Sequence, residues 1–194
     1  MIHIEKQHVI ESYESLDSMA FIKYLTDQYL NALGGQLSAE NMDELTADQH
    51  ALLCYRYILD EVMEGGFIQL ILNGYAPYVL EGPFPMVVKK EWGKEKEEDP
   101  LCPADISPSM GRPCGEKATS DVMKKFSKLL YEVKKEYHKH QEELSQDMSD
   151  EEFMALYEQL EELNELGDDF LDEHQEEVTP AVAKMMVENL DKYV

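Results

Sequence analysis

Apolar positions along the chain recur mostly every three or four residues, which is the spacing of amphipathic helices. The spacing predicts helices over residues 16–33, from Thr46 to Gly65-Gly66, over about 67–73, about 120–145 and 149–177, and from Thr179-Pro180 to the last residue. Thr46 and Ser149 each have a capping-box partner three residues later, which favours helix starts there. The pattern therefore predicts an all-α fold, a compact multi-helix domain spanning residues 1–194.

Residues 81–118 differ from the rest of the chain, because they hold six of its eight prolines and four of its ten glycines. Such a density interrupts regular elements rather than building them. We expect an insertion or functional loop over 81–118, with a poorly ordered surface loop as the alternative. Within it, Phe84 to Trp92 leaves room for one short strand.

The net charge of −24 excludes several classes of protein. A chain with 41 acidic and 17 basic residues repels nucleic-acid phosphates and anionic membrane surfaces, so direct binding to either is not expected. There is no apolar stretch long enough to span a membrane and no secretory signal at the N-terminus. Three cysteines (Cys54, Cys102 and Cys114) suit a reducing compartment and leave open whether Cys102 and Cys114 pair. We expect a cytoplasmic protein.

The charge is concentrated toward the end of the chain. Residues 1–87 carry a net −10, residues 88–140 a net +2 and residues 141–194 a net −16. The 149–177 helix has one apolar seam, and every formally charged side chain on it is acidic. Seven i,i+4 pairs of acids repel one another there, a conflict expected at functional sites. We take its polar face as the candidate partner-binding site, comprising Glu158, Glu161, Glu162, Glu165, Asp168, Asp169, Asp172, Glu173 and Glu176. The alternative is a merely solvated face, neutralised in part by lysines of the 120–145 helix.

A double glycine marks a second feature, the motif Gly65, Gly66, Phe67, Gln69 and Asn73. The two glycines can supply the positive φ that ends one helix and starts the next at a sharp angle. Phe67 would anchor the corner, and Gln69 and Asn73 share a helix face. This pattern indicates a structural corner with polar caps, or a small-molecule pocket built on the two amides.

The motif resembles that of a bacterial DNA-mimic protein family, long known only as a domain of unknown function. The family pattern is Glu-Val-x-Asn-Gly-Gly-Phe-x-Gln-aromatic-aromatic-x-Asn, and the matching residues are Glu61, Val62, Gly65, Gly66, Phe67, Gln69 and Asn73. Glu64 replaces the asparagine, and Leu70-Ile71 replaces the aromatic pair. Residues 163–170 and the tail 190–193 are also similar to the family, so that the resemblance covers roughly residues 40–80 and 150–194.

The resemblance implies an all-helical acidic protein that occupies the DNA-binding surface of a basic DNA-binding protein, such as a transcription repressor. It leaves a homodimer possible and implies no catalytic residue. The sequence shows no phosphate loop, nucleophile elbow, zinc-protease helix or di-iron pattern, so we expect no enzyme activity, cofactor or metal. Two other functions stay open: an immunity or antitoxin-like protein that neutralises a basic toxin, and a small-molecule-binding domain at the Gly65-Gly66 corner.

Overall fold

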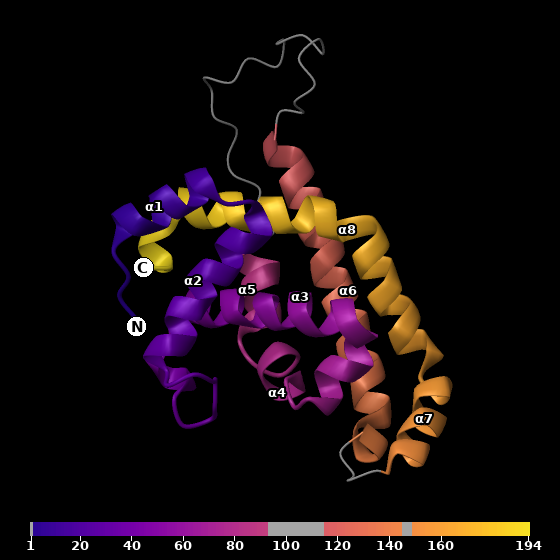
Figure 1. Cartoon of the computed structure of the whole chain (residues 1–194). Coiled ribbons are helices and arrows are strands. Elements are labelled where there is room, and N and C mark those ends of the chain that lie inside the picture. The colour runs from indigo at the N-terminus through magenta and orange to yellow at the C-terminus, as the bar shows by residue number, and fades with distance from the viewer. Residues whose placement is uncertain (1, 93–114, 145–148) are drawn as a thin grey trace.

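The computed structural model describes residues 2–92, 115–144 and 149–194, and these residues form a helical fold without a β-strand (Figure 1). The predicted all-α class is confirmed. The α-helices are α1 (Lys6–Ser15), α2 (Ser18–Ala32), α3 (Ala47–Leu72), α4 (Ala76–Val79), α5 (Phe84–Val87), α6 (Gly115–Leu144), α7 (Asp150–Gln159) and α8 (Glu161–Glu188). Short 3-10 turns, η1 (Met42–Glu44) and η4 (Leu190–Lys192), and one π-helical turn, η2 (Val88–Trp92), complete the described elements.

Helix α3 runs through the middle of the molecule (Figure 1). Its side chains are buried on all sides rather than on one stripe, as expected for a helix surrounded by others. It begins where the sequence predicts, because the Thr46 hydroxyl accepts from the Gln49 N–H at 3.1 Å and the Gln49 side chain accepts from the Thr46 N–H. Helices α2, α4, α5, α6 and α8 contact α3, whereas α1 packs against α2 and α8.

The short strand for which residues 84–92 left room does not form, because this segment folds into α5 and η2. Phe84, Val87, Val88 and Trp92 are buried, and their spacing is that of a helix face. The ring of Phe84 lies edge-on to that of Phe126, with 6.1 Å between centroids, and to that of Trp92 at 5.7 Å. The burial of these large rings against α6 stabilises a helical segment here, although the prolines on their own favour turns. The remainder of the predicted 81–118 insertion lies mostly outside the described residues.

The predicted 149–177 helix is interrupted at Leu160, whose φ of −99° and ψ of 35° separate α7 from α8. Ser149 does cap α7, through the predicted capping box with Glu152. The predicted helix start at Thr179 is wrong, because α8 continues through Thr179 and Pro180 to Glu188. Thr179 is buried instead, and its hydroxyl is hydrogen-bonded to the Tyr55 hydroxyl at 2.8 Å.

Helix α1 was not predicted from the sequence. Val9 is its only residue classed as buried, so it lacks the apolar stripe on which such predictions depend. It lies beside the C-terminal part of α8 (Figure 1), where Lys6 forms an ion pair with Asp191.

Candidate protein-binding site

The candidate site is the acidic surface of α7 and α8. Ten acidic side chains described on these helices are exposed, namely Glu151, Glu152, Glu158, Glu161, Glu162, Glu165, Asp168, Glu176, Glu177 and Glu188. Six of them belong to the predicted site: Glu158, Glu161, Glu162, Glu165, Asp168 and Glu176. The backbones of Asp169, Asp172 and Glu173 lie in α8, but their side chains fall outside the described part of the structure.

Four of the exposed acids form an outer ridge on α8, which we define as Glu161, Glu165, Asp168 and Glu176. At 3.6 residues per turn, these positions lie within about 80° of one another around the helix axis. The opposite side of α8 is the apolar seam, where Leu163, Gly167 and Phe170 are buried. The ridge therefore faces outward along α8.

The charge density of this part of α8 is high. Residues 161–177 contain nine acids and no lysine or arginine. They span about 25 Å at 1.5 Å per residue, or one carboxylate per roughly 2.8 Å. A single DNA strand carries one phosphate per roughly 3.4 Å of axis. The break at Leu160 shortens the predicted straight array, and it places Glu158 and Glu162 on different helices, so they are not a helical i,i+4 pair.

The break also gives the acids some local support. It creates a second helix N-terminus, and Glu161 and Glu162 occupy the first turn of α8. The positive end of the helix dipole favours carboxylates there. On α7, hydrogen bonds from the Ser149 backbone and side chain lower the pKa of Glu152. Such interactions offset part of the repulsion among the acids.

Lysines of α6 lie beside one flank of the acidic surface. Lys139 donates to both carboxylate oxygens of the buried Glu136 at 2.6 Å, and this hydrogen bond, with smaller contributions from Glu162 and other acids, raises the Lys139 pKa. The same contact lowers the Glu136 pKa. The α6 flank is thus partly neutralised, as the alternative interpretation of the sequence expected. Glu161, the first residue of the outer ridge, also lines the pocket that Glu136, Lys139 and His140 of α6 form with the start of α8.

The Gly65-Gly66 corner packs against α8. Gly66 has a φ of 70° and a ψ of −170°, values essentially restricted to glycine, and α3 changes direction there. The ring of Phe67 packs edge-on against Phe170 of α8, with 6.4 Å between centroids. A Cβ atom at Gly167 would lie 3.2 Å from the Gly66 Cα. The two features singled out from the sequence, the double glycine and the acidic helix, are therefore in direct contact.

The amides of Gln69 and Asn73 close the corner rather than facing a ligand. Both donate to the carboxylate of Glu61, from Gln69 Nε2 at 3.2 Å and from Asn73 Nδ2 at 2.7 Å. Gln69 Nε2 also lies 3.3 Å from a carboxylate oxygen of Glu64. The sequence indicated the shared face of the two amides, but the role of Glu61 as their common acceptor was missed. That role requires the bend at Gly65-Gly66, which brings the two halves of α3 together.

Other chemistry is not assembled in the described residues. Within residues 2–92, 115–144 and 149–194, no group of three or more His, Cys, Asp or Glu side chains is placed to hold a metal ion. Among the same residues, no helix is long and apolar enough to cross a membrane.

The fold and this surface define an all-helical protein with a dense, outward-facing array of carboxylates. No family model matches the chain. A curated relative is the DNA mimic protein DMP19 of Neisseria meningitidis serogroup B (strain ATCC BAA-335 / MC58), which is 34% identical over 73 residues. The matched part is 38% of this chain and 44% of that protein, so the similarity spans less than half of either. It confirms the resemblance to the DNA-mimic family that the double-glycine motif indicated.

Proposed function

We propose that this protein is a DNA mimic, whose acidic α7–α8 surface occupies the DNA-binding surface of a basic DNA-binding protein such as a transcription repressor. Residues 161–177 of α8 carry the proposal, because their nine acids come at a density close to that of phosphates on one DNA strand, and four of them form the outward-facing ridge. The named relative supports the same function. Charge complementarity would speed association and make the affinity fall steeply with salt.

The protein would act by binding rather than by catalysis. The thiol of Cys54 is fully buried. Burial raises its pKa, so the reactive thiolate is disfavoured. Burial also lowers the pKa of the neighbouring His50, whose Nδ1 lies 3.5 Å from the Cys54 Sγ. These side chains fill the core beside Tyr78, where the thiol donates to the Tyr78 carbonyl oxygen at 3.4 Å.

The experiment is affinity capture at low salt followed by DNA competition. The immobilised protein should retain a DNA-binding protein that is released by about 0.5 M salt, at which the screening length is only a few ångströms. In a gel-shift assay, the protein should displace DNA from that captured partner. Capture of a DNA-binding protein from which this protein does not displace DNA would overturn the proposal. Capture of a toxin held at its catalytic surface would favour the immunity function instead.

Two matched variants test whether the displacement of DNA depends on the outer ridge. The ridge variant carries Glu165→Gln, Asp168→Asn and Glu176→Gln. The control variant carries Glu14→Gln, Glu40→Gln and Asp43→Asn, which removes the same charge from exposed positions on α1 and around η1. The ridge variant should lose displacement by about tenfold or more, and the control should retain it. Equal loss in both would show that net charge, not the ridge, is responsible.

A further inference from the structure

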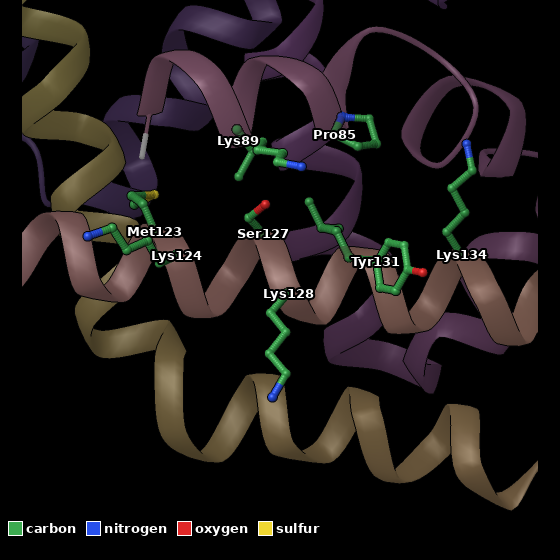
Figure 2. A pocket seen from close by; sticks show the side chains of 10 residues that line it. Pro85, Lys89, Met123, Lys124, Ser127, Lys128, Tyr131 and Lys134 are labelled. Atoms are coloured by element: carbon green, nitrogen blue, oxygen red, sulfur yellow. The ribbon is translucent and has the colours of Figure 1, made fainter. Parts of the chain in front are cut away.

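A groove of about 410 Å³ lies between α5–η2 and α6, on a part of the molecule that the acidic surface does not use. Figure 2 shows Pro85 and Lys89 on one wall and Ser127 on the facing wall, with Lys124 toward one end and Lys134 toward the other. Val88, Met123 and Leu130 also line the groove and are buried.

One large apolar side chain is exposed at this groove. Tyr131, which lines it, is 66% exposed. A large exposed aromatic side chain at a groove with an apolar lining is typical of protein-interaction surfaces.

The groove also carries positive charge in a strongly negative protein. Residues 84–92 and 121–131 contain five lysines, Lys89, Lys90, Lys124, Lys125 and Lys128, and two acids, Glu91 and Asp121, for a local net charge of +3. All five lysines are exposed, and Lys89, Lys124 and Lys128 line the groove itself. Lys124 is paired with Asp121 at 3.8 Å, and at the far end Lys134 donates to the Leu80 carbonyl oxygen at 2.9 Å and to Glu81 at 3.0 Å. With these acids counted, the groove keeps an excess of lysines and an apolar lining.

The chemistry of the groove restricts what can bind there. A small inorganic anion would contact the lysines alone and leave the apolar lining unused. A long nucleic acid would meet the field of a protein of net charge −24, whose acids extend beyond the groove. A short acidic segment of a protein feels mainly the charges within about one Debye length, roughly 10 Å. It can also place an apolar side chain against Tyr131 and the lining.

We propose that this groove binds an acidic segment of a partner protein, with its carboxylates at Lys89 and Lys124 and an adjacent apolar side chain against Tyr131. This site is separate from the proposed DNA-mimic surface and does not depend on it. A partner could therefore be held here while the outer ridge of α8 is occupied.

The test uses a fluorescein-labelled peptide, Glu-Glu-Leu-Phe-Glu-Glu, and fluorescence anisotropy at about 0.1 M salt, where the Debye length is roughly 10 Å, with the full chain. Lys89→Gln with Lys124→Gln, and separately Tyr131→Ala, should each weaken binding by about tenfold or more. These three side chains are exposed, so the substitutions should leave the fold intact. The matched control is Lys6→Gln with Lys184→Gln, two exposed lysines on α1 and α8, and it should bind the peptide as the unmodified protein does.

The peptide is varied in parallel. Replacing its glutamates by glutamine, or its Leu-Phe by Ser-Ser, should abolish saturable binding. The proposal is overturned if the unmodified protein does not bind the peptide, or if the control weakens binding as much as the groove variant. It is also overturned if the Ser-Ser peptide or a short DNA duplex binds the groove equally well. Peptide binding by the α8 ridge variant should be unchanged, so that failure of the DNA-mimic proposal would be recognised separately.

Discussion

Gly167 of α8 lies against the backbone of Gly66 at the corner of α3, where a Cβ atom on Gly167 would stand 3.2 Å from the Gly66 Cα and 3.5 Å from the Phe67 nitrogen. This contact joins the double-glycine motif to the helix that carries the acidic ridge. Because Gly66 has a conformation essentially restricted to glycine, its backbone cannot easily move aside. The position of the ridge thus depends on the absence of a side chain at residue 167.

We therefore expect Gly167→Ala to lower the free energy of unfolding by about 1 kcal/mol, the lower end of the usual cost of overpacking. The same substitution inside an unconstrained helix ordinarily raises stability by about 0.5–1 kcal/mol. Urea denaturation measures the difference. Gly74→Ala is the comparison, because Gly74 has a φ of 83° and open space around its missing Cβ, so that variant reports backbone strain alone. If Gly167→Ala is instead more stable than the unmodified protein, the Gly66 backbone moves to make room for the added methyl group.

Glu61 should be the main polar residue of the corner. Glu61→Leu removes the acceptor shared by Gln69 and Asn73, and we expect a loss of about 1 kcal/mol in the free energy of unfolding, limited because water can reach these groups. Glu64→Leu is the matched control. Glu64 is exposed and lies 3.3 Å from Gln69 Nε2, so its loss should cost only a few tenths of a kcal/mol. Equal effects of the two substitutions would contradict the role of Glu61 as the common acceptor of Gln69 and Asn73.

Periodicity predicted most of the helices, and glycine chemistry predicted the corner, because both are local properties of the chain. The tertiary contacts could not be predicted in this way. Phe84 and Trp92 stand in a proline-rich segment, and only their burial beside Phe126 makes that segment helical. Thr179 has the sequence of a helix cap, yet its hydroxyl is used by Tyr55, 124 residues away. The acidic face of the helix could be predicted from the sequence. Its outer ridge could be told apart from the rest of that face only from the structure, which places α6 along one flank.

The Glu136–Lys139 pair should make stability depend on pH. Hydrogen bonding to Lys139 lowers the pKa of Glu136 from its ordinary value of 4.5, so the stabilisation is present above that pH and declines as pH falls through the lowered pKa. The pKa of Lys139 is raised from 10.5, so the same contact weakens as pH rises through that higher value. Glu136→Gln should therefore be less stable than the unmodified protein at pH 7, and the difference should shrink in acid. Urea denaturation across this pH range measures it, and a difference independent of pH would contradict the assignment.

The ridge variant should be more stable than the unmodified protein even though it loses binding. By sequence spacing, Glu165→Gln, Asp168→Asn and Glu176→Gln remove four like-charged i,i+4 pairs of α8: Glu161/Glu165, Glu165/Asp169, Asp168/Asp172 and Asp172/Glu176. At a few tenths of a kcal/mol for each pair, the free energy of unfolding should rise by about 1 kcal/mol. Glu161 is kept, because a carboxylate in the first turn of α8 is favourable.

Thermal unfolding at low and high salt separates this repulsion from other effects of the substitutions. Added salt should raise the melting temperature of the unmodified protein more than that of the ridge variant, because screening weakens a repulsion that the variant lacks. The control variant with Glu14→Gln, Glu40→Gln and Asp43→Asn should respond to salt like the unmodified protein. A ridge variant that is destabilised, or whose advantage persists at high salt, would show that these carboxylates are not held together against their repulsion. In that case a merely solvated face would account for the acidic helix.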